Sequence, residues 1–412
     1  MEKRDIIAKY AYEKSVFYRD YIYKNYDEDE FDFEELPVIC KDDIVDSCIP
    51  LQPVEYLLQD DDTDERVIKM STSGTTGKVL KIYWNKDDFL KSMTPLWYLR
   101  KKYYGINTND RMCFFYTIRK IGLEEMQEFE DKNTLGFSKT SLDEERLKII
   151  YQRMLEYEPI WLLLQPSTAQ MLLNTAKKYN FPPIHSLRYI ELSGEMLTDS
   201  LKNALTGYFG CKVANQYGSY EFNSIAYECP YGNMHVMVSN VFVEVMDEAN
   251  NLLEEKEGEF VITSLTNRRN PFIRYRIGDR GSMTNIQGCP CGNHNPVIRL
   301  TVGRSHNYVR CEDGTKVNAY IFARAVENVN YLLDDVVKQF QVIQRGINDF
   351  LVRMYIDDRS MMLEIKEVFE ENILDASLKN ARFEYCFERE YIKDEYGDKL
   401  MYFKNNCSIN DR

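Results

Sequence analysis

Apolar residues recur at helical spacing through the first 25 or so residues of the chain. Ile6, Ile7, Tyr10, Phe17 and Tyr21 follow the spacing of one helix face, which predicts an amphipathic helix. An acidic run, DEDEFDFEE at 27–35, comes next. Because closely spaced carboxylates repel one another and favour water, we expect this run to form a solvated loop.

From residue 67 onward, short runs rich in apolar and β-branched residues alternate with longer helical patterns. The runs of strand length lie at 67–73, 78–84, 110–118, 159–165, 187–193 and 212–218. The helical patterns lie at 141–158, 166–179 and 198–210, and their starts carry the Ser, Thr or Asp that helix N-caps prefer. Strand–helix alternation of this kind predicts an α/β domain with a largely parallel sheet.

The pattern changes twice in the second half of the chain. Residues 240–266 have the pattern of strand, acidic turn and strand, which indicates an antiparallel element. Beyond residue 304 the order is helix, strand, turn, strand, a further helix and a β-rich tail. About 105 residues suffice for a small α+β domain. The sequence therefore predicts an α/β chain with a large N-terminal domain of mixed sheets and helices at 1–303 and a small α+β domain at 304–412.

Charge and cysteine usage narrow the range of partners. The chain of 412 residues has 52 Lys+Arg against 66 Asp+Glu, a formal net charge of −14. This balance argues against nucleic-acid binding, which needs a basic face, but it allows a nucleotide substrate held by backbone amides and a few local cations. No apolar run approaches the ~18 residues of a membrane span. Ten mostly scattered cysteines without an export signal indicate reduced thiols, so we expect a cytoplasmic protein without a membrane partner.

The strongest chemical signal is a turn of glycines, hydroxyls and a lysine between two predicted strands. It consists of Ser71, Thr72, Ser73, Gly74, Thr75, Thr76, Gly77 and Lys78. Glycines allow the backbone to approach phosphate oxygens, hydroxyls and amides donate hydrogen bonds to them, and the lysine adds a mobile positive charge. The spacing differs from a Walker A loop, since only two residues separate the glycines and Val79 follows the lysine. A plain Gly/Ser/Thr-rich hairpin turn is the alternative.

This turn resembles the phosphate loop of the adenylate-forming superfamily, which includes acyl-CoA synthetases, adenylation domains and luciferase-like enzymes. Further segments resemble the motifs of that superfamily in the same order: Ser193-Gly194-Glu195, Asn215-Gln216-Tyr217-Gly218-Ser219-Tyr220-Glu221, Arg274-Tyr275-Arg276-Ile277-Gly278-Asp279 and Gly303-Arg304-Ser305. Within the superfamily the phenylacetate–coenzyme A ligase branch is the most similar, on segments such as 15–19, 263–266, 271–276 and 289–292.

The resemblance implies a role for each motif. The loop from Thr72 to Lys78 would hold the β- and γ-phosphates of ATP, and Ser193, Gly194 and Glu195 would lie beside the adenine. Gln216, Tyr217, Gly218 and Ser219 belong to the next motif, in which Tyr217 would stack on the adenine. Glu221 would bind Mg²⁺, and Asp279 would accept both ribose hydroxyls. Arg304 would reach the ribose or the phosphates from the hinge to a C-terminal lid.

A lysine of the lid would meet the carboxylate and the α-phosphate. The segment 396–400 resembles the corresponding element, which favours Lys399, with Lys404 as the second candidate. Three positions depart from the usual motifs. Val79 replaces a proline, Tyr220 replaces a threonine and His306 follows the hinge where an aspartate is common. We expect these changes to affect lid rotation and thioester formation.

Three thiols and one imidazole form a candidate zinc site. Cys229 and His235 are one pair, Cys289 and Cys291 the other, and both occur in turn-rich segments about 55 residues apart. Soft thiolates with one histidine suit tetrahedral Zn²⁺, here in a structural role, and His294 is a spare candidate ligand. Unpaired loop cysteines are the alternative.

The resemblance predicts an enzyme that activates a small, aromatic carboxylic acid with ATP and transfers the acyl group to CoA. The acyl pocket would be lined by segments 114–116 and 165–167. These aromatic residues are equally compatible with a sheet core. Two alternatives remain, namely transfer to an amine or a carrier-protein thiol, and a catalytically inactive nucleotide-binding homologue. A homodimer is also compatible with the sequence.

Overall fold

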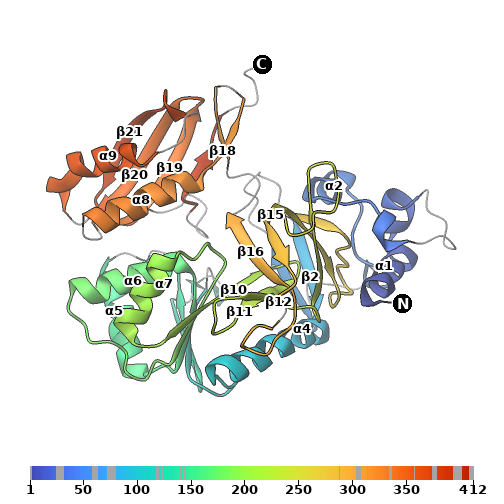
Figure 1. Cartoon of the computed structure of the whole chain (residues 1–412). Coiled ribbons are helices and arrows are strands. Elements are labelled where there is room, and N and C mark those ends of the chain that lie inside the picture. The colour runs from blue at the N-terminus through green and yellow to red at the C-terminus, as the bar shows by residue number, and fades with distance from the viewer. Residues whose placement is uncertain are drawn as a thin grey trace. The chain divides into compact units, whose positions relative to one another are not determined.

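The computed structural model describes residues 2–24, 32–57, 64–71, 80–116, 120–121, 124–125, 127–139, 142, 144–286, 288–302, 308–312, 314–333, 336–356, 358–373, 378–392 and 401–407. The chain divides into two compact units (Figure 1). The first unit comprises Met1–Thr108 and Ala214–Arg304, and the second comprises Asn109–Val213 and Ser305–Arg412. The predicted division into domains at 303/304 stays a prediction, since the second unit also takes residues from the middle of the chain.

The first unit is built around antiparallel strands. Its sheet has the strand order β13-β14-β15-β16-β12-β11-β10, and β1 and β2 form a separate hairpin. The strands are β1 (Val67–Ser71), β2 (Lys81–Asn85), β10 (Lys212–Ser219), β11 (Asn223–Glu228), β12 (Met234–Val236), β13 (Val241–Met246), β14 (Gly258–Ser264), β15 (Tyr275–Thr284) and β16 (Val297–Val302). The helical segments are α1 (Lys3–Lys14), η1 (Phe17–Ile22), η3 (Phe33–Glu35), α2 (Lys41–Ser47), α3 (Val54–Leu57), α4 (Lys86–Leu99) and η4 (Arg100–Tyr104).

The N-terminal segment differs from both expectations for it. The predicted helix is interrupted at Ser15, whose hydroxyl is buried and donates to the Leu51 carbonyl oxygen (2.9 Å). A π-helical turn, η1, then continues the segment. Part of the acidic run lies outside the described residues, but its end forms η3 with a buried Phe33 ring. The prediction of solvation holds for the carboxylates of Asp32, Glu34 and Glu35, which are exposed, but not for Phe33, whose apolar ring packs on Phe242.

Parallel strands with flanking helices form the middle part of the second unit. Strands β7, β3, β8 and β9 are paired in parallel, and β6 adds an antiparallel edge. The strands are β3 (Met112–Tyr116), β4 (Lys120–Ile121), β5 (Glu124–Glu125), β6 (Glu128–Asp131), β7 (Thr134–Ser138), β8 (Trp161–Leu164) and β9 (Tyr189–Ser193). The helices α5 (Glu144–Tyr157), α6 (Pro166–Lys178) and α7 (Asp199–Phe209) bury their apolar faces in one core with these strands. The predicted strand–helix alternation is thus confirmed here.

The C-terminal part of the second unit is a four-stranded sheet with two helices (Figure 1). The strand order is β21-β20-β19-β22, and phenylalanines of α8, α9 and the strands form the core beneath the helices. The elements are β17 (Tyr308–Arg310), β18 (Lys316–Asn318), α8 (Tyr320–Leu332), β19 (Val337–Gly346), β20 (Asp349–Ile356), η5 (Arg359–Met361), α9 (Met362–Glu371), β21 (Arg382–Glu388) and β22 (Phe403–Asn405). The predicted order of helix, strand, turn, strand and helix is confirmed.

Candidate nucleotide site and metal cluster

The β10–β11 hairpin of the first unit carries most of the motif that ends at Glu221. Its strands are antiparallel and shift register between Tyr217 and Gly218. A methyl group at Gly218 would lie 2.1 Å from the Asn223 carbonyl oxygen, so only glycine allows the strands to approach this closely. The Gln216 side chain donates to the Ser224 hydroxyl (3.0 Å). These contacts fix the hairpin, and the turn between its strands presents Glu221.

Asp279 lies on β15 in a distorted part of the strand. Glu259 pairs with Arg280 and Val261 with Arg276, so three residues of β15 lie opposite a single residue of β14. Gly278 adopts a φ of 87° in this segment, a left-handed conformation that favours glycine. Extra residues in one strand bend it and reorient a side chain. The bulge thereby turns the Asp279 carboxylate toward the β10–β11 hairpin.

The two motifs meet at a hydrogen bond. The Tyr217 hydroxyl donates to Asp279 Oδ2 at 2.7 Å, across 62 positions of sequence. The sequence predicted one nucleotide contact from each residue but no contact between them. The nearby Ser219 hydroxyl is buried and has no hydrogen-bond partner among the described residues. The first unit therefore brings an aromatic ring, a carboxylate and an unsatisfied hydroxyl into the same hairpin region.

The hairpin that flanks the predicted phosphate loop contacts the same turn. β1 and β2 are antiparallel, and Ser71 pairs with Lys81. Trp84 on β2 is fully buried, and its indole Nε1 donates to the Tyr220 carbonyl oxygen (2.9 Å). The predicted phosphate-binding residues Thr72, Ser73, Gly74, Thr75, Thr76, Gly77 and Lys78 lie outside the described residues, so their role stays a prediction.

A second predicted cluster gathers at one end of the β11–β12 and β15–β16 connections. The ligand atoms of Cys229, His235, Cys289 and Cys291 all lie within 4.8 Å of one another. Pairing of β12 with β16 brings the two halves together. The sulfurs of Cys229 and Cys289 are 3.9 Å apart, and Cys291 Sγ is 3.4 Å from His235 Nε2. Tetrahedral zinc with bonds of ~2.3 Å to sulfur and ~2.0 Å to nitrogen requires separations of roughly 3.8 and 3.5 Å, so the geometry fits the ion.

Neighbouring groups orient these ligands. His235 Nδ1 donates to the Asn295 carbonyl oxygen (3.0 Å), which leaves the Nε2 lone pair directed at the thiols. Asn233 donates to Cys289 Sγ at 3.4 Å and the Tyr103 hydroxyl to Cys291 Sγ at 3.5 Å. Desolvation works against ionisation of Cys289, but hydrogen bonds to its sulfur, chiefly from Cys291 and also from Asn233, outweigh it and lower the pKa of this thiol to about 6. Burial raises the pKa of Cys229 to about 11.

The chain is similar in sequence and in structure to several known proteins. No family model matches the chain. Protein CapK of Staphylococcus aureus is 24% identical over 416 residues, 96% of this chain and 86% of that protein. The phenylacetate-coenzyme A ligase of Thermus thermophilus is 25% identical over 261 residues, 62% of this chain and 55% of that enzyme. A crystal structure of 2-hydroxyisobutyryl-CoA ligase in the postadenylation state matches with a TM-score of 0.75 and 16% identity, over 98% of this chain and 88% of that one.

The chain has the fold of the adenylate-forming acyl-CoA ligases. The predicted resemblance and the predicted α/β fold class are therefore confirmed. None of the described helices is long and apolar enough to cross a membrane.

In this adenylate-forming fold, the predicted adenine-side turn has a structural role in the second unit. Glu195 accepts hydrogen bonds from the Ser167 amide and hydroxyl (2.8 and 2.9 Å) and thereby caps the N-terminus of α6. Gly194 has a φ of 81°, and Ser193 is the last residue of β9. The turn is therefore held at the carboxyl end of a parallel strand, where ligands of open α/β sheets bind.

Lys139 lies at the same edge of the sheet and is not among the predicted site residues. Lys139 directly follows β7, and its ammonium donates to Gln165 Oε1, directly after β8 (2.9 Å). Strands β7, β3 and β8 are parallel neighbours. A polar residue directly after an apolar strand was the available signal. Nearby, Phe114 crosses Gly136 so closely that a methyl group there would lie 2.6 Å from the ring.

Two predicted residues lie outside the described part of the chain. These are Arg304 at the hinge and the catalytic candidate Lys399. Lys404, the second candidate lysine, is on β22 and pairs with Ile343 of β19. The roles of all three stay predictions.

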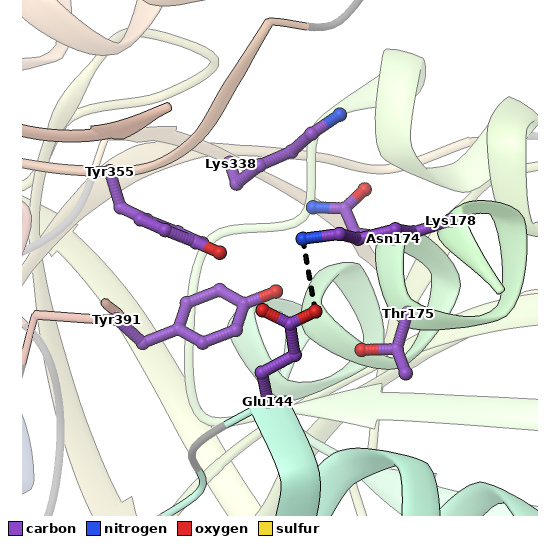
Figure 2. Close-up of a pocket in the computed structure, with 7 residues that line it drawn as sticks. All are labelled: Glu144, Asn174, Thr175, Lys178, Lys338, Tyr355 and Tyr391. Atoms are coloured by element: carbon purple, nitrogen blue, oxygen red, sulfur yellow. Dashed lines mark ion pairs between the residues drawn. The ribbon is translucent and has the colours of Figure 1, made fainter. Parts of the chain in front are cut away.

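A small polar pocket in the second unit contains none of the predicted site residues. Figure 2 shows its lining of Glu144, Asn174, Thr175, Lys178, Lys338, Tyr355 and Tyr391. Lys178 and Glu144 form an ion pair at 2.9 Å. The rings of Tyr355 and Tyr391 are 4.6 Å apart and pack against the core of α5 and α6. Because Tyr355 and Tyr391 are buried, the residues around this pocket favour a role in packing.

Proposed function

We propose that the protein is an ATP-dependent acid–CoA ligase that forms an acyl-adenylate and then transfers the acyl group to CoA. The observation that carries this proposal is the Tyr217–Asp279 hydrogen bond beside the Glu221 turn. It unites two of the superfamily motifs in one region of the first unit. Support comes also from the solved ligase with the same fold, whose structures hold 2-HIB-AMP and, in two cases, CoA as well.

The proposed first step joins two anions. The carboxylate of the acid attacks the α-phosphorus of ATP, the bond to the β-phosphate oxygen breaks, and pyrophosphate leaves. Positioning and electrostatic stabilisation account for most of such catalysis. Asp279 would accept both ribose hydroxyls with its two oxygens, while the Tyr217 hydroxyl fixes the orientation of the carboxylate. The loop Thr72–Lys78 would hold the terminal phosphates.

Mg²⁺ fits the donor set that Glu221 offers. Glu221 is a carboxylate, 6% exposed, at the tip of the hairpin turn. Mg²⁺ is usually held by one or two carboxylates together with substrate phosphate oxygens. When bound, the ion would neutralise charge on the departing pyrophosphate. Lys399 would approach the reacting carboxylate and the α-phosphate, and Arg304 would contact the nucleotide from the hinge between the proposed domains at 1–303 and 304–412.

In the second step the CoA thiol would attack the acyl carbonyl carbon, and AMP would leave with the bonding electron pair. The acid is proposed to be small and aromatic, on the basis of the rings of Phe114 and Tyr116, which lie 5.6 Å apart at the carboxyl edge of the second unit's sheet. The proposed location is the cytoplasm, with the chain alone or as a homodimer.

We also propose that Cys229, His235, Cys289 and Cys291 bind a structural Zn²⁺. The separations of the donor atoms and the donors around the thiols support this. Because the cluster connects β11–β12 with β15–β16, the ion would stabilise the sheet that carries Asp279. Zinc would have no part in the chemistry.

Acid-dependent exchange of labelled pyrophosphate into ATP, measured over a panel of carboxylic acids, tests the first step. We expect exchange with at least one small aromatic acid. Exchange with none, by a folded protein that binds zinc, would refute adenylation and favour an inactive homologue. Mass spectrometry after addition of CoA tests the second step, because a thioester appears only if CoA is the acceptor.

A further inference from the structure

The turn that carries Glu221 is anchored by a residue directly after it. Tyr220, Glu221 and Phe222 connect β10 to β11, and Asn223 is the first residue of β11. Asn223 has a φ of 58°. Among residues with side chains, asparagine is one of the few that adopt this left-handed conformation readily. The backbone therefore reverses direction at Asn223, two residues after the proposed metal ligand.

The side chain of Asn223 is tied to helix α4. Its Nδ2 donates to the Ser92 hydroxyl at 2.7 Å, and Ser92 is fully buried. The same hydroxyl donates to the Phe89 carbonyl oxygen at 2.6 Å. Asn240 donates from its Nδ2 to the Ser92 carbonyl oxygen at 2.8 Å, which holds this turn of α4 in place. A buried hydroxyl with defined donor and acceptor partners is a rigid anchor, because breaking either bond leaves a polar group unsatisfied.

The other side of the turn is anchored independently. Trp84 donates to the Tyr220 carbonyl oxygen at 2.9 Å. Phe222 is fully buried and packs against Phe272 and Tyr275, with ring centroids 5.7 and 6.1 Å away. Glu221 therefore lies between Tyr220, whose carbonyl oxygen is hydrogen-bonded, and Phe222, whose ring is packed in the core. The Asn223–Ser92 bond holds the side of the turn that leads into β11.

We propose that Asn223 is a positioning residue that sets the Glu221 carboxylate for the divalent cation, through its hydrogen bond to Ser92. This inference rests on the proposed function, since it takes Glu221 as the metal ligand. The inference concerns only the binding of the divalent cation at Glu221. The hydrogen bond holds the turn in the arrangement that binds a divalent cation together with nucleotide phosphates, and its loss weakens binding of the cation while the fold persists.

Asn223→Gly is the sharpest test variant. Glycine accepts the left-handed backbone without strain and removes only the side-chain hydrogen bond. Ser92→Ala removes the hydroxyl that accepts the hydrogen bond from Asn223. Asn180→Gly is the matched control, because Asn180 has a φ of 51° in an exposed turn of the second unit. Asn223→Asp is a second loss variant, since aspartate also tolerates this backbone but cannot donate to the Ser92 hydroxyl, whose single proton goes to the Phe89 carbonyl oxygen.

Two measurements report on the cation. The first is binding of Mn²⁺, as a spectroscopic substitute for Mg²⁺, in the presence of ATP, followed by electron paramagnetic resonance. The second is the Mg²⁺ dependence of pyrophosphate exchange. We expect Asn223→Gly and Ser92→Ala each to raise the half-saturating cation concentration about tenfold, the size expected for one lost hydrogen bond. The maximal rate at saturating cation should change little, Asn223→Asp should not retain the parent's cation affinity, and Asn180→Gly should match the parent protein.

The outcomes separate this inference from the proposed function. If the parent protein binds Mn²⁺ with ATP and Asn223→Gly binds it equally well, the positioning role is refuted while the function stands. If both Asn223→Gly and Ser92→Ala lose maximal rate and thermal stability with unchanged cation affinity, Asn223 is only structural. If the parent protein neither binds Mn²⁺ with ATP nor exchanges pyrophosphate, the proposed function fails and this inference with it.

Discussion

The two candidate sites of the first unit lie at opposite ends of one strand. β11 begins at Asn223, directly after the turn with Glu221, and ends at Glu228, directly before Cys229. At the Cys229 end, four ligand atoms converge within 4.8 Å from two short connections. At the Glu221 end, donors and acceptors come from β10 and β15, and the predicted phosphate loop would add further donors. The candidate metal site is nearly complete in itself, whereas the candidate nucleotide site depends on several segments of the chain.

This difference predicts opposite sensitivities. Loss of one metal ligand should affect stability first, because the cluster connects strands and has no proposed substrate contact. Loss of a nucleotide contact should affect activity first and leave the fold intact. Four substitutions can break or sharpen this comparison.

The largest effect is expected for Asp279→Ala. Removing the carboxylate deletes two charge-assisted hydrogen bonds to the ribose, each worth about 2 kcal/mol, so kcat/KM for ATP should fall roughly a thousandfold. Zinc content should be unchanged. Pyrophosphate exchange at varied ATP measures the first quantity and elemental analysis the second. Asp358→Ala is the control, because that carboxylate accepts from Ser360 near η5 and is not part of the proposed nucleotide site. Near-normal exchange in Asp279→Ala would exclude its proposed role.

Gly218→Ala is expected to affect both sites through the fold. The added methyl group would lie 2.1 Å from a backbone oxygen of the paired strand, and no side-chain movement relieves that contact. We expect destabilisation of about 3 kcal/mol, measured by denaturant unfolding, with loss of exchange. Gly207→Ala is the control, because Gly207 lies in α7 with open space around it, and alanine should stabilise a helix by up to about 1 kcal/mol. Equal stability of the two variants would contradict the close strand approach.

The surroundings of Asp279 and Gly218 could be predicted only in part from the sequence. The sequence supplied the residue types of the nucleotide site through recognisable motifs, and its local periodicity predicted most helices and strands. It did not supply the β15 bulge that turns Asp279, because register depends on pairing with β14. Nor did it reveal the burial of Arg274, whose guanidinium pairs with Glu244 at 3.1 Å. Long-range pairing of β12 with β16 likewise decided that the two cysteine pairs meet.

Cys229→Ala should affect the candidate zinc site at one end of β11 and leave the candidate nucleotide site at the other end nearly unchanged. One ligand is lost from the proposed zinc site, so bound zinc should fall below half an equivalent and the protein should lose about 2 kcal/mol of stability. That loss corresponds to a fall in Tm of a few degrees. KM for ATP should change less than about threefold, a difference below 1 kcal/mol. Cys211→Ala is the matched control, since Cys211 is also buried but lies in the second unit, outside the cluster. Full zinc in Cys229→Ala, or none in the parent protein, would contradict the proposed site.

The smallest effect is expected for Tyr220→Thr, which restores the threonine common in the resembling motifs. Tyr220 has a bulky ring where the resembling motifs have a small hydroxyl, but the residue is 52% exposed, and its carbonyl oxygen accepts from Trp84. Because that backbone contact is independent of the side chain, the turn should persist and stability should change by less than about 0.5 kcal/mol. A threonine hydroxyl near the phosphate would add one hydrogen bond, so kcat for exchange should rise by about tenfold at most. A fall in kcat with unchanged cation affinity would show instead that the Tyr220 side chain itself contributes to the site. The segment before β11 would then differ in chemistry from the corresponding segment of proteins with the same fold.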